Sequence, residues 1–149
     1  FVDLCAGTGS VGFEALSRGA KTVHLVERDK FAFRALKVSI DKLNSRELND
    51  KIGNIKLSNK DSLIWLKNYL KNNTNLADNI IFLDPPYHDK SIYIETIKLL
   101  TKYKFPGEIW IEFDIKGPKE VLDYFNIIYE KFGPKEYKQG NHRLITFKF

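Results

Sequence analysis

Two motifs in this chain of 149 residues combine a carboxylate with residues that restrict or shape the backbone. In the first, Asp84 is followed by Pro85, Pro86 and Tyr87, and the apolar run Ile80-Ile81-Phe82-Leu83 precedes it. Such a run is typical of a buried parallel strand, which two prolines would end. Open α/β sheets bind ligands beyond the carboxyl ends of their strands. The tetrad therefore predicts a rigid carboxylate and ring able to hold a planar amine, although on an isolated loop it would be only a turn.

The second motif is a glycine-rich segment, DLCAGTGSVG from Asp3 to Gly12, between a strand-like start and a helix-like segment. Its glycines allow a tight turn, and the N–H groups at the helix start attract a carboxylate or a phosphate. Gly7-x-Gly9-x-x-Gly12 matches the dinucleotide fingerprint, and Glu27 follows Gly7 by 20 positions, where an acid would hold ribose hydroxyls. Nicotinamide cofactors and S-adenosylmethionine both carry an adenosine, so this motif alone fits either cofactor.

Two further carboxylates favour S-adenosylmethionine. Asp3 precedes the glycine loop, where it could meet the positive amino group of a methionine moiety. Asp61 follows the strand-like stretch Ile55-Lys56-Leu57-Ser58, and it could accept a hydrogen bond from an adenine amino group. Asp61 could equally cap the helix that begins there, and the two roles are compatible.

The elements that must position these motifs alternate along the chain. Strands are predicted near 1–4, 22–27, 54–58, 79–83 and 107–113, and helices near 10–18, 29–46, 61–72, 91–103 and 117–124. This alternation predicts a mostly parallel sheet covered by helices on both faces. Asn126 to Phe132 and Leu144 to Phe149 are predicted as a final antiparallel pair of strands. That pair is typical of Rossmann-like methyltransferase sheets and argues against a dinucleotide dehydrogenase.

These motifs resemble one family in order and spacing, the bacterial small-subunit (16S) rRNA guanine-N2 methyltransferases. The resemblance rests on the segments DLCAGTGSVGFEALSRGA (3–20), VERD (26–29), Asp61, LDPPY (83–87) and EYKQGNHRL (136–144). It implies an α/β, Rossmann-like class I methyltransferase fold with a mostly parallel seven-stranded sheet and an antiparallel C-terminal hairpin. It also implies methyl transfer from S-adenosylmethionine to the exocyclic N2 amine of a guanine, with S-adenosylhomocysteine as the product.

The resemblance assigns roles to individual residues. The methionine part of the cofactor would lie against Asp3, Ala6, Gly7, Thr8, Gly9 and Ser10, the ribose against Glu27, and the adenine against Asp61 and Ser62, with Cys5 and Arg28 in the same pocket. Asp84, Pro85, Pro86 and Tyr87 would act on the target base. Many members carry Phe at the position of Tyr87, and either ring can stack on a flipped base.

Tyr87 also leaves alternatives open, because amino-methyltransferases that act on adenine N6 or cytosine N4 favour Tyr at that place. A cofactor-binding or RNA-binding protein without activity is a third hypothesis. Cys5 is interpreted as a small buried hydrophobe rather than a nucleophile. A single cysteine and three scattered histidines give no ligand spacing, so no metal is expected.

The charge balance favours an anionic partner. The formal net charge is +5, although solvated lysines alone would give the same balance. More informative is a basic turn near the C-terminus, where Tyr137 lies among Lys131, Lys135, Lys138, His142 and Arg143. We expect rRNA or the small ribosomal subunit as partner, with His88, Tyr137, Lys138 and Arg143 as candidate contacts.

The length and the hydrophobic content of 43% predict one domain over residues 1–149. No run approaches the ~20 apolar residues of a membrane span, and no leader is seen, so a cytoplasmic monomer without membrane contact is expected. The predicted first strand has only four residues before Cys5, and the chain contains no methionine. A further segment is therefore expected before this strand, as in the family that the motifs resemble.

Overall fold

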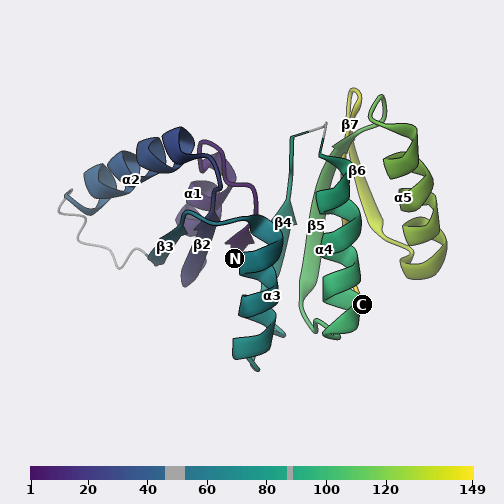
Figure 1. The fold of residues 1–149 in the computed structure, drawn as a ribbon, viewed down its shortest axis with the longest axis horizontal. Coiled ribbons are helices and arrows are strands. Elements are labelled where there is room, and N and C mark those ends of the chain that lie inside the picture. The colour runs from purple at the N-terminus through teal and green to yellow at the C-terminus, as the bar shows by residue number, and fades with distance from the viewer. Residues whose placement is uncertain (46–52, 87–88) are drawn as a thin grey trace. The chain divides into compact units, whose positions relative to one another are not determined.

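The computed structural model describes residues 1–45, 53–86 and 89–149, and it contains two compact units (Figure 1). The first unit is Phe1–Trp65 and the second is Leu66–Phe149. Tyr87 and His88, two of the residues that the sequence analysis selected, lie outside the described residues.

The first unit contains three parallel strands in the order β3-β2-β1. Its elements are β1 (Val2–Asp3), α1 (Ser10–Ser17), β2 (Thr22–Val26), α2 (Lys30–Asn44), β3 (Asn54–Ser58) and the start of α3 (Ser62–Asn72). Val23 and Leu25 of β2 are fully buried against Leu16 of α1 and Leu36 of α2. Parallel strands buried in this way carry their polar residues at their ends, and that is where the carboxylates of the candidate site lie.

The second unit contains the strand order β4-β5-β7-β6. After the rest of α3 come β4 (Ile80–Leu83), α4 (Lys90–Lys102), β5 (Glu108–Asp114), α5 (Lys119–Phe132), β6 (Lys135–Gln139) and β7 (His142–Lys148). β4 and β5 are parallel, whereas β7 is antiparallel to both β5 and β6. Phe113 of β5 packs against Phe125 of α5 with ring centroids 4.2 Å apart.

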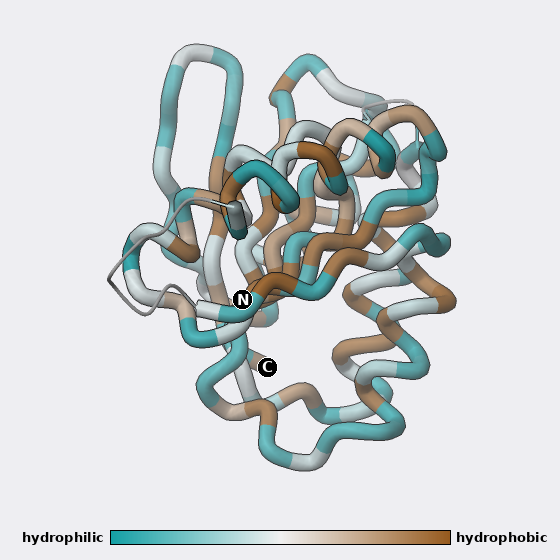
Figure 2. Tube along the Cα trace, turned by 90° about the vertical axis from the view of Figure 1, so that its left-hand side faces the viewer, coloured by the Kyte–Doolittle hydropathy of each residue, from teal (hydrophilic) through white to brown (hydrophobic). Residues whose placement is uncertain are grey.

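The fold class expected from the sequence is confirmed. The seven strands of the described residues are parallel in the first unit and mixed in the second, where β6 and β7 form the antiparallel hairpin. Figure 2 shows brown, hydrophobic stretches and teal, hydrophilic stretches alternating along the trace. No helix in the described part of the chain has both the length and the apolar composition that a membrane span requires.

The strand predicted over Asn126 to Phe132 is wrong, because these residues are the second half of α5. Val121, Phe125 and Ile128 recur at helical spacing on its buried face. Gly133, with φ of 53°, ends the helix in the left-handed region, and Pro134 follows. The strand that pairs with β7 is instead β6, which starts at Lys135.

Candidate functional site

The glycine loop joins β1 to α1 in a tight turn. Gly7 and Gly9 have φ values of 51° and 79°, in the left-handed region that favours glycine. The Gly9 N–H donates to the Ala6 carbonyl at 2.6 Å, which closes the turn. A Cβ atom on Gly9 would lie 2.5 Å from Cδ2 of Leu36, so the loop lies close against α2. Gly7, Thr8 and Ser10 are exposed at its surface.

Glu27 follows β2 and its carboxylate connects two loops. The Gly7 N–H donates to Oε2 at 2.8 Å, and the Asp29 N–H donates to Oε1 at 2.7 Å. Asn59 supports the same turn, since its side-chain amide donates to the carbonyls of Glu27 at 2.8 Å and Arg28 at 3.1 Å. The sequence analysis missed this role of Asn59, although its position directly after β3 was a signal. The Arg28 side chain is exposed.

Asp61 and Ser62 stand at the start of α3. Oδ1 of Asp61 accepts the N–H groups of Leu63 at 3.0 Å and Ile64 at 3.1 Å, so Asp61 caps the helix. The buried Ser62 hydroxyl donates to the Leu4 carbonyl at 2.7 Å and lies 3.6 Å from the Cys5 sulfur. These contacts bring the start of α3 to the end of β1, where Asp3 is buried with 2% of its surface exposed.

Three carboxylates therefore occupy the carboxyl ends of three neighbouring parallel strands: Asp3 at β1, Glu27 after β2 and Asp61 after β3. These three acceptor groups suit a ligand that donates through hydroxyl and amino groups and carries a positive charge. It disfavours a pyrophosphate, whose negative charges would meet carboxylates. The residues thus fit S-adenosylmethionine better than a dinucleotide.

A hollow of the first unit does not coincide with this arrangement of carboxylates. A groove of about 1050 Å³ runs between α1 and α2, and its lining includes Thr8 and Ser10 of the glycine loop together with Lys42 and Leu43. Glu27, Asp61 and Ser62 are not among its lining residues. We therefore base the candidate cofactor site on the strand ends and their hydrogen bonds rather than on this groove.

In the second unit, Asp84 follows the last residue of β4. Pro85 is buried and Pro86 is exposed, and the Pro86 carbonyl accepts the Asp89 N–H at 2.8 Å. Burial raises the pKa of Asp84 from its ordinary value of 3.8 to about 6, with a further increase from the charge of Glu112 and a decrease from His142. A carboxylate with such a pKa is ionised at neutral pH yet accepts a proton more readily than an ordinary Asp.

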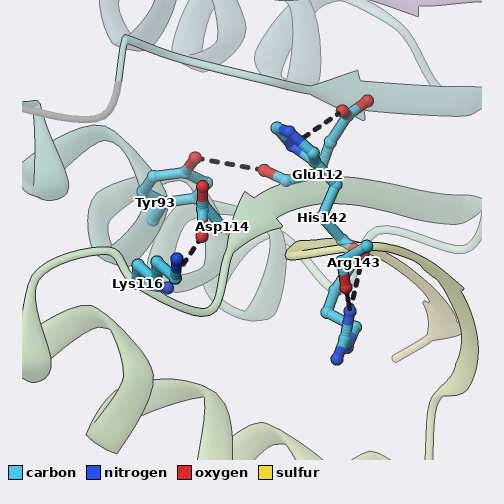
Figure 3. Close-up of polar contacts among 7 residues, drawn as sticks. Tyr93, Glu112, Asp114, Lys116, His142 and Arg143 are labelled. Atoms are coloured by element: carbon cyan, nitrogen blue, oxygen red, sulfur yellow. Dashed lines mark hydrogen bonds and ion pairs between the residues drawn. The ribbon is translucent and has the colours of Figure 1, made fainter.

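Glu112 lies on β5 near Asp84. Its Oε1 is 3.8 Å from Nδ1 of His142, and Figure 3 shows the imidazole turned toward this carboxylate. The Tyr93 hydroxyl of α4 donates to the Glu112 carbonyl at 3.1 Å. The sequence analysis missed Glu112, because Glu108 and Asp114 are also acids in β5 and no local pattern distinguishes Glu112 from them.

The basic turn is the hairpin between β6 and β7. Tyr137 has 57% of its surface exposed, and Lys138 pairs with Glu136 at 3.2 Å. Arg143 donates through Nη1 to the carbonyls of Gly140 and His142, both at 2.8 Å, and its Nε lies 3.3 Å from Glu136. Figure 3 shows the Arg143 side chain directed away from Glu112. These contacts give Arg143 a structural role in the turn, and its contact with RNA stays a prediction.

Comparison with known proteins places these features in one family. The family described as Conserved hypothetical protein 95 matches residues 1–140, which include the glycine loop, Asp61 and Asp84. The chain belongs to this family.

Within residues 1–45, 53–86 and 89–149, no group of three or more His, Cys, Asp and Glu side chains is arranged as a metal site.

The chain is similar to named proteins from bacteria. It is 38% identical over 104 residues to the ribosomal RNA small subunit methyltransferase D of Buchnera aphidicola (Acyrthosiphon pisum), covering 70% of this chain and 48% of that protein. The protein of the same name in Haemophilus influenzae is 41% identical over 88 residues, covering 58% of this chain and 41% of that protein. The chain thus spans about half the length of these relatives.

A solved structure shows the same fold at lower identity. The N-terminal domain of human METTL16, in complex with SAH, has a TM-score of 0.73 and 15% sequence identity, covering 99% of this chain and 60% of that chain. The protein described here therefore has the class I methyltransferase fold.

Proposed function

We propose that this protein transfers a methyl group from S-adenosylmethionine to the exocyclic N2 amine of a guanine in small-subunit rRNA. The observation that carries the proposal is the position of Asp84-Pro85-Pro86 directly after β4, in a chain whose named relatives are small-subunit rRNA methyltransferases. We further propose that residues 1–149 act as one methyltransferase domain, as a monomer in the cytoplasm.

The first unit would hold the cofactor. Glu27 accepts one N–H on each of its two oxygens, which leaves acceptor sites that suit ribose hydroxyls. Asp61 and Ser62 would bind the adenine, with Cys5 and Arg28 beside them. The methionine part would lie along Asp3 and the loop Ala6, Gly7, Thr8, Gly9 and Ser10. When bound, S-adenosylmethionine supplies a methyl group on a sulfonium that is already activated for displacement by a nitrogen lone pair.

The second unit would hold the acceptor base. An exocyclic amine is a weak nucleophile because its lone pair is delocalised into the ring. The Asp84 carboxylate and the Pro85 carbonyl would accept the two N–H groups of the amine, and the Tyr87 ring would stack on the base. Asp84 would take the amine proton as the nitrogen becomes positive, and its pKa of about 6 suits this exchange at neutral pH.

RNA would contact the basic turn. The exposed Tyr137 and Lys138 offer a ring for stacking and a cation for a phosphate, with His88 and Arg143 as further candidates. The pI of about 9.2 supports an anionic substrate of this kind.

The test is transfer of labelled methyl from S-adenosylmethionine to unmodified small ribosomal subunits, naked rRNA and DNA, followed by nucleoside analysis. The natural full-length protein, this chain, Asp84→Asn and the control Asp78→Asn are compared. Asp78 is an exposed residue before β4, so its variant makes the same change of charge outside the tetrad.

Label in N2-methylguanosine that disappears only with Asp84→Asn is the expected result. Label in methyladenosine or methylcytosine would replace the proposed base with that of an adenine or cytosine amino-methyltransferase. If the full-length protein binds cofactor and RNA but transfers no methyl group, the result would contradict the proposed enzymatic activity and favour a binding protein.

A further inference from the structure

Asp84 shares one face of the sheet with three residues from β5 and β7. Leu83 of β4 pairs with Ile111 of β5, so Asp84 comes level with Glu112. His142 of β7 pairs with Asp114, two residues beyond Glu112. Side chains at paired and at alternate positions lie on the same face of a sheet. The strand register therefore gathers two carboxylates and an imidazole beside Asp84.

The contacts of these groups differ. Asp114 is engaged in its own turn, where Oδ1 accepts the Lys116 N–H at 2.7 Å. Glu112 is held through its backbone by Tyr93, and its carboxylate faces the His142 imidazole at 3.8 Å. Around Glu112, Figure 3 shows Asp114 of the same strand, His142 of β7 and Tyr93 of α4.

We propose that Glu112 and His142 are positioning residues that adjust the protonation of Asp84 in opposite directions. Glu112 brings a like charge to one side of Asp84 and favours its protonated form. His142, when protonated, neutralises Glu112 and favours the carboxylate form. The consequence for methyl transfer rests on the proposed function of Asp84, whereas the effect on Asp84 itself does not.

The direction of each effect follows from the charges. Desolvation is the largest cause that raises the pKa of Asp84, the charge of Glu112 is the second, and His142 opposes both. Glu112→Gln removes the like charge at nearly constant size, so the pKa of Asp84 should fall. His142→Gln removes the imidazole that opposes both effects, so the pKa of Asp84 should rise.

The strand pairing supplies matched controls. Glu108 and Lys148 face each other at the far end of β5 and β7. Glu108 lies four residues before Glu112, which is about 13 Å along a strand. Glu108→Gln and Lys148→Gln make charge changes of the same kind in the same strands, away from Asp84.

The experiment is a carboxyl 13C NMR titration of Asp84 in the protein without cofactor or RNA, with thermal unfolding to verify that each variant is folded. The titration midpoint should fall by roughly 0.5 to 1 pH with Glu112→Gln and rise by a similar or smaller amount with His142→Gln. The two controls should leave it within about 0.2 pH. A midpoint that stays fixed in Glu112→Gln, or that moves in the same direction in both variants, would overturn the inference.

The pH profile of methyl transfer, measured on the same variants, separates this inference from the proposed function. The rate of methyl transfer should fall on the acidic side of the profile. If the pH of that fall moves with the NMR midpoints of Asp84, the result supports both the inference and the proposed function. NMR midpoints that move as expected in a protein that transfers no methyl group would support the inference and contradict the proposed function. If the protein is active but the acidic side of its pH profile does not follow the NMR midpoint of Asp84, Glu112 and His142 do not control methyl transfer through Asp84.

Discussion

The Glu27 carboxylate is bound by two backbone N–H groups, from Gly7 and Asp29, so its position does not depend on a ligand. Asn59 fixes the turn beneath it through two further carbonyls. A carboxylate held in this way needs little reorganisation to accept ribose hydroxyls, which lowers the entropic cost of binding.

Replacing Glu27 tests this role. We expect Glu27→Gln to weaken S-adenosylmethionine binding about 10- to 100-fold, because charge-assisted hydrogen bonds are lost on both the loop side and the ribose side. Isothermal titration calorimetry measures the change. Glu14→Gln, an exposed acid on α1, is the control, and equal affinity of the two variants would contradict the role of Glu27.

Asp84 also carries a prediction about stability. Its pKa is raised from 3.8 to about 6 in the folded chain, so the folded state binds this proton more tightly than the unfolded state. The stabilisation from protonated Asp84 is complete below pH 3.8 and is lost as the pH rises through about 6. Ionised Asp84 therefore destabilises the fold at pH 8.

We expect Asp84→Asn to raise the free energy of unfolding at pH 8 by about 1 kcal/mol, a value reduced to allow for partial solvent contact. At pH 4 the difference should nearly vanish, because Asp84 is then largely protonated in the folded chain. Urea unfolding of Asp84→Asn and Asp78→Asn at both pH values checks this. A variant that is less stable than the parent chain at pH 8 would show that the Asp84 carboxylate stabilises the fold.

At the scale of elements, the sequence predicted those parts whose signals are local. Asp84 after an apolar run, and Glu27 at 20 positions from Gly7, could be assigned because strand ends and glycine turns carry their own residue patterns. Glu112 could not be assigned, because its neighbours depend on the register of β5 against β4 and β7.

The error at α5 has a related cause. Ile127 and Ile128 lie in the predicted strand, and β-branched residues such as these favour strands. Ile128 instead continues the apolar face of Val121 and Phe125, and tertiary packing on that face decides the helix. β6 was missed because its polar sequence KEYKQ, mainly exposed, shows no apolar alternation.

The glycine loop carries a prediction at this scale. Gly9→Ala should lower the free energy of unfolding by about 2 kcal/mol, since it adds a strained positive φ and a Cβ atom 2.5 Å from Leu36. Gly19→Ala is a matched control, because Gly19 has φ of 93° but no atom within 4 Å of an added Cβ. Urea unfolding measures the free energy of unfolding of both variants, and the difference between them is the contribution of packing at Gly9. Equal losses of free energy in the two variants would contradict close packing of the loop on α2.

At the scale of the whole molecule, the net charge of +5 is modest, and its distribution is more informative than its size. Lys131 lies in the last turn of α5, and Lys135 and Lys138 lie on β6, the strand that carries Tyr137. Such a cluster would act on RNA phosphates together, which makes its contribution depend on salt.

Replacing Lys131, Lys135 and Lys138 with Gln should weaken rRNA binding and lower the slope of log K against log salt concentration by about 2. Filter binding or fluorescence anisotropy over a range of salt concentrations measures that slope. A variant with Lys67, Lys71 and Lys102 replaced by Gln removes the same charge from exposed positions on α3 and α4. Equal slopes for the two triple variants would contradict a specific role of the basic turn.

β6 is the final strand in the sheet order, and its charges have a consequence of a different kind. A terminal strand offers unpaired backbone groups to another chain, and lysines along it discourage such pairing. The exposed Lys135 and Lys138 of β6 therefore also oppose edge-to-edge pairing between copies of the chain, a consequence separate from any contact with RNA.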